Sequence, residues 1–247
     1  MKEPIVSTPV SGSYRRRIVI RPGTGVTQAE MEDYYHHFAV SITHTTVIDS
    51  IEVTPVRTPW ATCVGGIAGA QRLVGLTIAE ARDQKRWGYD PSEQCTHVAD
   101  LCAVAVRHAH DVESLRFDVL VRPPATPDRT AWLFRNGQQR IEWRFEGDRV
   151  RTPGPLDAMA PESREFLVAA REHFDAEGLE EVMVLRRACR IAFGCGIDLD
   201  DFPTAGDVYG PDGSCHTYRK DIAPIGFRNV GSGNPAVDGP VPEVEGV

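Results

Sequence analysis

The chain has 247 residues, of which 41% are hydrophobic, and a formal net charge of −8. This length and composition suffice for one large domain or two small ones with a buried core, and the scattered lysines and arginines of an acidic chain argue against a nucleic-acid-binding surface. No apolar run approaches about 18 residues, and no apolar segment follows the first residues, so we expect neither a membrane span nor a secretory signal. The cytoplasm is the expected compartment.

The first half of the chain predicts strands and short helices. Alternating apolar and polar residues indicate strands, and apolar residues three or four positions apart indicate helices that bury one face. Thr27 and Glu30 have the spacing of a capping box, and Thr77 precedes an amphipathic run. In chain order we expect a strand at 16–21, a helix at 27–37, an antiparallel hairpin of strands at 38–43 and 46–56, helices at 64–74 and 78–85, and a long helix at 96–109.

The second half repeats the order of strands followed by helices, with strands expected at 115–122, 130–134 and 140–145 and helices at 161–174 and 179–193. Asn136-Gly137 is typical of a two-residue hairpin turn. We therefore predict an α+β fold in which an antiparallel sheet carries helices on one face, either as one domain or as two similar lobes. The predicted division is a disordered start at 1–14, a Cys/His-containing lobe at 15–112, a second lobe at 113–231 and a disordered tail at 232–247.

Two cysteines and a histidine at predicted helix starts form the core of the candidate site. Cys63 precedes the small-residue helix, and Cys95 stands just before the long helix, whose first turn carries His97. Free backbone amides at a helix start lower a thiol's pKa, and two thiolates with one imidazole are three typical zinc ligands. We predict a metal site of Cys63, Cys95 and His97 with His36 as a further ligand. His37, His44 and Asp33 are alternatives for that further ligand, and an open position for water, as in catalytic sites, is another. For the cysteines, the alternative is that they are small buried core residues.

Three other residues are candidate catalytic groups. His37 adjoins His36, so only one of the two can face the site. Arg57 could bind an anionic group of a substrate, although pairing with a carboxylate is the preferred interpretation. Asp100 stands close to one helical turn after His97 and could orient its imidazole or be a solvated charge. Whether the later pair Cys215-His216 folds back onto the site stays open, because its spacing matches no metal template.

These motifs resemble those of a bacterial domain-of-unknown-function family, DUF2889. The shared features are an Asp-X-X-His segment at 33–36, an Arg-X-Pro-Trp-X-X-Cys turn at 57–63 and a Cys-Thr-His helix start at 95–97. The resemblance covers roughly residues 16–110 and extends more weakly to the Cys215 region. It implies an architecture more than a chemistry.

A more distant similarity is to the iron–sulfur scaffold family. The stretch at 63–81, CVGGIAGAQRLVGLTIAEA, looks like the segment of that family that carries a ligand cysteine, and Cys95 falls where the scaffold has its last ligand cysteine. The resemblance implies that Cys63 and Cys95 are ligands on an antiparallel sheet with helices on one face. The chain departs from the family in lacking its Cys-Gly-Asp motif and in having Cys-Thr-His where the scaffold has His-Cys.

The preferred function is therefore a metal-dependent enzyme, with zinc before iron, that acts on a small molecule as a lyase, hydratase or hydrolase. One alternative is a non-enzymatic carrier of sulfur or of an iron–sulfur cluster, and another is a metal-free enzyme with a nucleophilic cysteine. The chain has no dinucleotide-binding, Walker or Gly-X-Ser-X-Gly motif, which disfavours nucleotide binding and serine hydrolysis. The expected partner is a small-molecule substrate, neither nucleic acid nor a membrane is expected, and a homodimer stays open.

Overall fold

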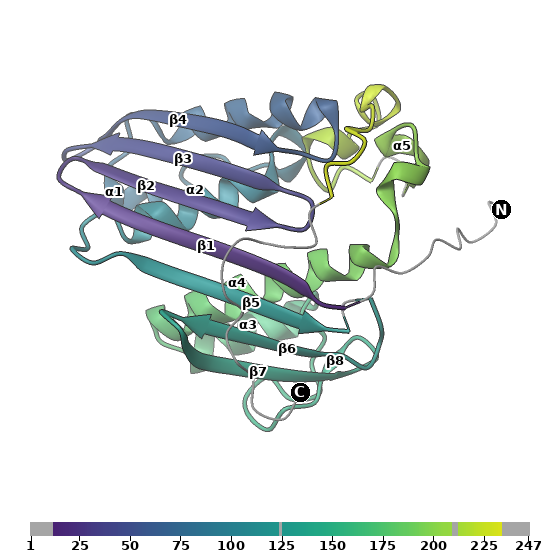
Figure 1. Ribbon diagram of the computed structural model, residues 1–247. Helices are drawn as coiled ribbons and strands as arrows, with labels where there is room; N and C mark the ends of the chain where they lie inside the picture. Colours follow the sequence, from purple (N-terminus) through teal and green to yellow (C-terminus); the bar gives the residue numbers. More distant parts are fainter. Residues whose placement is uncertain (1–11, 124, 209–211, 234–247) are drawn as a thin grey trace. The chain divides into compact units, whose positions relative to one another are not determined.

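The computed structural model describes residues 12–123, 125–208 and 212–233 (Figure 1). Antiparallel strands are combined there with α-helices and short 3-10 helices, which confirms the predicted α+β class. The chain divides into two compact units. Within the described residues, the Cys/His unit consists of Ile18–Leu115 and residues 199–233, and the second unit consists of residues 12–17 and Arg116–Asp198. None of the described helices is long and apolar enough to cross a membrane.

The Cys/His unit is built on strands that follow one another as neighbours in the order β4-β3-β2-β1. Helix α2 packs on β2 and β3, and the 3-10 helix η1 packs against β4 and α2. The strands and main helices are β1 (Tyr14–Gly23, of which residues 18–23 belong to this unit), β2 (Val26–Asp33), β3 (His37–His44), β4 (Ile48–Arg57), η1 (Ala61–Leu73), α1 (Ile78–Ala81) and α2 (Thr96–Arg107). Short elements complete the unit, namely η2 (Pro91–Glu93), η4 (Leu199–Asp201), α5 (Ala205–Val208), η5 (His216–Tyr218) and η6 (Ala223–Ile225).

The helix predicted at 27–37 is wrong, because this segment forms strand β2 and the turn that follows it. The residues of β2 alternate in burial with the period of two that a strand requires. The spacing of Thr27 and Glu30 matches a capping box only by coincidence, and tertiary burial decides the conformation. His36 consequently lies in a tight turn between β2 and β3. The buried positions of β2 are Thr27, Ala29, Met31 and Asp33, and the less buried ones are Gln28, Glu30 and Glu32.

The two helices predicted at 64–74 and 78–85 are present in altered form. The first is a 13-residue 3-10 helix, η1, and the second is α1, which has only four residues. Thr77 caps α1 as predicted, since its Oγ1 accepts a hydrogen bond from the backbone N–H of Glu80 (3.2 Å) while the Glu80 carboxylate accepts one from the Thr77 N–H (3.0 Å). This reciprocal capping box fixes the start of α1 in the segment between η1 and α2.

The second unit agrees closely with the sequence-based expectation. Its strands follow the order β5-β6-β7-β8, and Asn136 and Gly137 have φ of 49° and 85°, as the hairpin between β6 and β7 requires. Helix α3 packs on the sheet through Phe166, whose ring lies 5.5 Å from that of Trp143. The elements are β5 (Leu115–Arg122), β6 (Thr130–Arg135), β7 (Gln138–Glu146), β8 (Arg149–Val150), α3 (Arg164–His173), α4 (Ala176–Ala192) and η3 (Phe193–Gly196).

Residues 199–231 belong with the Cys/His unit, whereas the sequence-based division placed them in the second lobe. Two contacts show why. The side-chain amide of Asn229 donates to the carbonyl oxygen of Thr58 (3.0 Å), and the Arg228 guanidinium donates to that of Pro59 (2.7 Å). Of the ends predicted to be disordered, residues 1–11 and 234–247 lie outside the described residues.

Candidate functional site

A tight turn between β2 and β3 fixes the position of His36. The N–H of Asp33 donates to the carbonyl oxygen of His36 (2.8 Å), which closes the turn. The Asp33 Oδ1 atom accepts hydrogen bonds from the N–H groups of Tyr35 (2.9 Å) and His36 (2.8 Å). Aspartate suits this place because its short carboxylate can bond to backbone groups two and three residues ahead.

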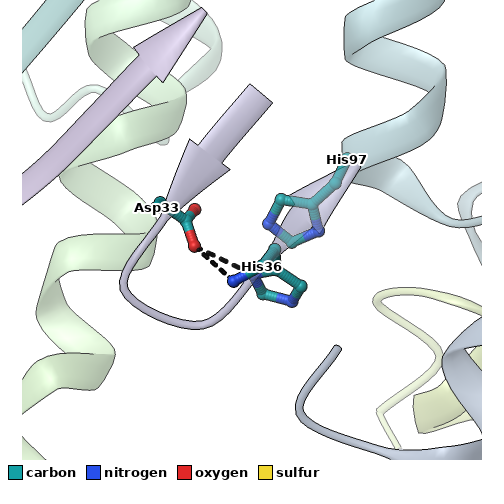
Figure 2. Close-up of side chains that lie close together, drawn as sticks. All are labelled: Asp33, His36 and His97. Carbon is teal, nitrogen blue, oxygen red and sulfur yellow. Dashed lines mark hydrogen bonds and ion pairs between the residues drawn. The ribbon is translucent and has the colours of Figure 1, made fainter. Parts of the chain in front are cut away.

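The same Asp33 oxygen also orients the imidazole of His36. Oδ1 lies 3.1 Å from Nδ1 of His36, within hydrogen-bonding distance (Figure 2). Asp33 is fully buried and His36 is 9% exposed. The turn therefore presents a carboxylate oxygen and a ring nitrogen side by side.

His97 completes the cluster from the first turn of α2. Its ring stacks on that of His36, with centroids 3.8 Å apart and an interplanar angle of 25° (Figure 2). The Nε2 atom of His97 is excluded from solvent. One ligand atom from each of Asp33, His36 and His97 lies within 4.8 Å of the others. A β-turn and a helix start thereby place two imidazoles and one carboxylate within reach of one ion.

Arg57 holds the turn through its backbone carbonyl oxygens. Its guanidinium donates to the carbonyl oxygens of Asp33 (2.7 Å), Tyr34 (2.8 Å) and Ser232 (2.9 Å). It also donates to the carboxylate of Glu32 at 3.0 Å. Pairing with a carboxylate was the preferred interpretation of this residue, and the structure adds three backbone acceptors. Arg57 is a positioning residue for the turn that carries His36.

The other two candidate catalytic residues lie beside the cluster. His37 is the first residue of β3. Its Nε2 atom lies 2.7 Å from the carboxylate of Glu30 in the neighbouring strand β2, so its ring is hydrogen-bonded to that strand. The structure therefore places His36, and not His37, next to His97. Asp100 lies close to one turn after His97 in α2, with its Oδ2 atom excluded from solvent. Its role as an orienting group stays a prediction.

Cys63 and Cys95 are both buried, and neither is a member of the cluster. Among the described residues, the side chains whose ligand atoms converge within 4.8 Å are Asp33, His36 and His97. Residues two positions apart at a helix start point in different directions, so Cys95 and His97 cannot both face His36. The backbone N–H of Cys95 instead donates to the carbonyl oxygen of Gly66 (2.9 Å), beside η1. The thiols' role as ligands stays a prediction.

The expected lowering of the thiol pKa values is wrong. Burial raises the pKa of Cys63 to about 12, and the hydrogen bond that its sulfur accepts from the Thr217 hydroxyl, at 3.6 Å, offsets this only in part. Burial likewise raises the pKa of Cys95, and the N–H groups at the start of α2 lower it by less. Loss of water around a thiolate therefore outweighs the favourable helix-start position.

Slow alkylation is the measurable consequence. The thiolate is the nucleophile, so we expect Cys63 and Cys95 of the folded protein to react with iodoacetamide at pH 8 at least about 100-fold more slowly than in denaturant. Cys215, which is partly exposed, should be labelled first of the three. Peptide mass spectrometry of timed samples measures this order. Preferential rapid labelling of Cys63 or Cys95 would contradict the burial argument and favour a nucleophilic cysteine.

The later pair Cys215-His216 does fold back towards Cys95. The N–H of His216 donates to the carbonyl oxygen of Gln94 at 3.0 Å. Two glycines of η1 make room for this approach. A Cβ atom at Gly65 would lie 2.4 Å from Nε2 of His216, and one at Gly66 would lie 2.6 Å from the backbone nitrogen of Cys95. Close packing of η1 on the start of α2 therefore depends on residues without side chains.

Gly66→Ala should destabilise the protein by about 1–3 kcal/mol, because the new methyl group would collide with backbone atoms that cannot move independently. Urea unfolding of the variant measures the change. Val64→Ala is the matched control, since Val64 lies in the same 3-10 helix and is 53% exposed, and we expect a change within about 0.5 kcal/mol. Equal midpoints for the two variants would show that η1 does not require the close approach.

Asp33 is the member of the cluster that is hardest to identify from the sequence. It was considered only as an alternative ligand, although the spacing Asp33-X-X-His36 matches a turn in which the carboxylate bonds to both backbone and imidazole. Reading residues 27–37 as a helix hid this signal. Thr217, which donates to the Cys63 sulfur, had no sequence signal, because 154 positions separate the two residues.

The fold and the cluster together define an α+β protein with a buried Asp/His/His group. Residues 20–110 match the model of a family described as a protein of unknown function, DUF2889. The match spans the motifs at 33–36, 57–63 and 95–97 on which the resemblance to that family rests. The matched region contains all three residues of the cluster. A search of curated proteins found no match.

Proposed function

We propose that the Cys/His unit is a metal-dependent enzyme module that acts on a small molecule, with its metal held by Asp33, His36 and His97. The observation that carries the proposal is the convergence of one ligand atom from each of these side chains within 4.8 Å. The metal is zinc by preference, because three nitrogen and oxygen ligands with an open position are typical of catalytic zinc. Iron(II) is the alternative, since two histidines and one carboxylate also suit non-haem iron.

The chemistry of the donor set fits such an ion. Oδ1 of Asp33 and Nδ1 of His36 are 3.1 Å apart, a separation that suits two ligands of one zinc ion with bonds of about 2.0–2.2 Å. The site is also shielded from bulk water, since Asp33 is fully buried and the Nε2 atom of His97 is excluded from solvent. A buried carboxylate is costly on its own, and a cation beside it would compensate its charge.

Each residue has a separate task in this proposal. A zinc ion at this position would supply Lewis acidity for a lyase, hydratase or hydrolase reaction of a carbonyl compound. Asp33 fixes the imidazole of His36, while Arg57 fixes the turn on which both residues stand. His97 is held independently by α2. Because two separate elements carry the histidines, the spacing of their rings depends on the packing of α2 against β2 and β3.

The thiol-based alternatives have less support. A nucleophilic cysteine needs an accessible thiol with a lowered pKa, whereas burial raises the pKa of Cys63 and Cys95. A carrier of sulfur or of an iron–sulfur cluster would use the same two thiols as its sulfur acceptors or ligands. Neither alternative uses the Asp33–His36–His97 cluster.

Metal binding and turnover test the proposal together. Chelator-treated protein dialysed against zinc should retain one zinc ion per chain by elemental analysis. The zinc-loaded protein and the His97→Ala variant are then incubated with a library of small carbonyl compounds and esters, and mass spectrometry detects products that differ by one water or by a cleaved fragment. We expect turnover by the wild type only. Protein that retains no zinc or iron, or equal turnover by both proteins, would overturn the proposal.

A further inference from the structure

The second unit contains a pocket that the proposed metal centre does not use. Its volume is about 510 Å³, within the range of about 300–1,000 Å³ typical of small-molecule sites. Helix α4 contributes Arg186, Cys189 and Arg190, and the loop before β6 contributes Arg129. Apolar surface comes from Phe193 among others, so the pocket combines hydrocarbon walls with positive charge.

Arg129 is buried without a counter-ion. It is 9% exposed, and in the described part of the chain no carboxylate lies within ion-pairing distance of its guanidinium. One terminal nitrogen donates to the carbonyl oxygens of Thr126 (3.3 Å) and Gly147 (3.2 Å), and the guanidinium carbon lies 4.0 Å from the centre of the Phe145 ring. Nε is buried and has no hydrogen-bond partner among the described residues. A buried charge of this kind is costly unless an anion compensates it.

The other charged groups of the pocket leave an excess of one positive charge. Arg186 and Arg190 both pair with Glu162, at 3.1 Å and 3.3 Å. Asp148 also lines the pocket and acts electrostatically on Arg129 over a distance longer than an ion pair, and its nearer partner is Arg149, at 3.9 Å, which is not part of the lining. The lining therefore holds three arginines and two carboxylates, and the arginine without a carboxylate is the most buried. A ligand with a single negative charge would balance this set.

We propose that this pocket binds a small apolar monocarboxylate. Its carboxylate pairs with the guanidinium of Arg129, a geometry for which arginine is well suited because two parallel N–H groups match two oxygens. Its hydrocarbon part lies against Cys189, Phe193 and Ala160, which line the same pocket. The site lies wholly within the second unit and does not depend on the proposed metal centre.

Calorimetric titration of the full chain with octanoate tests the proposal. We expect saturable binding of one octanoate per chain, at least about tenfold weaker binding of octan-1-ol, and at least about tenfold weaker octanoate binding by Arg129→Gln, because a hydrogen-bonded ion pair in a desolvated site is lost. Arg144→Gln is the matched control, since it removes a positive charge from an arginine of the same unit whose side chain is 71% exposed. Its octanoate affinity should equal that of the wild type.

A second variant keeps Arg129 and fills the pocket. Ala160→Trp should abolish octanoate binding while circular dichroism and the unfolding midpoint stay close to those of the wild type. This variant tests the proposal even if Arg129→Gln fails to fold. Absence of saturable octanoate binding to the wild type, equal affinities for octanoate and octan-1-ol, or undiminished binding by the Ala160→Trp variant would each overturn the proposal.

Discussion

Replacing either histidine of the cluster should weaken zinc binding by more than about 100-fold. Loss of a group that merely orients a ligand costs about 10–100-fold in metal affinity, and His36→Ala or His97→Ala removes a ligand itself. The two rings come from different elements, a turn and a helix, so neither can replace the other. Zinc affinities from competition with a chromophoric chelator measure the effect.

His37→Ala is the control for these variants. It removes a histidine adjacent in sequence whose ring faces Glu30 at 2.7 Å instead of the cluster. We expect its zinc affinity to stay within about threefold of the wild type, because no ligand or ligand-orienting group is lost. A large loss of zinc affinity in His37→Ala, with no loss in His36→Ala, would show that His37 is the ligand. That result would contradict the turn geometry.

Removal of the Arg57 side chain should cost about 3 kcal/mol of stability. Arg57→Met keeps most of the hydrocarbon volume but leaves the Glu32 carboxylate and three backbone carbonyl oxygens without their donor, and breaking a mostly buried charge pair costs about 3–5 kcal/mol. We take the lower end, because the side chain is 18% exposed and water can reach part of the gap. Chemical denaturation measures the loss.

Arg21→Met serves as the comparison, because Arg21 belongs to the same unit, its side chain is 52% exposed and it pairs with Glu30 at 3.4 Å. An exposed pair of this kind is worth about 0–1 kcal/mol. The Arg57 variant should also bind zinc about tenfold more weakly, since the turn that carries His36 loses its support. A stable Arg57→Met protein with unchanged zinc affinity would show that the turn holds its shape alone.

Much of the fold could be predicted where a local pattern and the burial agree. The strand at Leu115–Arg122 has the predicted bounds, and the Asn136-Gly137 turn joins two strands as its sequence indicates. The Thr27–Glu30 spacing failed because the same residue types suit a capping box and a half-buried strand, and only packing against β3 decides between them. Residues 199–231 were assigned to the second lobe, because the hydrogen bonds of Asn229 to Thr58 and of Arg228 to Pro59 join positions well over a hundred residues apart and leave no local pattern.

The candidate site was predicted only in part. The Cys95-X-His97 doublet correctly marked a helix start, and His97 does meet His36 there. Which side each residue faces depends on the first turn of α2 and on the approach of η1, and neither could be read from spacing. The thiols' environment was misjudged for a similar reason, because the extent of burial around Cys63 depends on Thr217 and its neighbours, far away in the chain. Arg129 has no recognisable motif in the sequence, because the residues that line its pocket come from separate segments of the second unit.

X-ray absorption spectroscopy at the zinc edge of the zinc-loaded protein tests the central claim most directly. A centre made by Asp33, His36 and His97 predicts nitrogen and oxygen neighbours at about 2.0–2.2 Å, with imidazole scattering from two histidines and no sulfur. Sulfur neighbours at about 2.3 Å would instead place the metal on the cysteines and contradict the Asp33–His36–His97 centre.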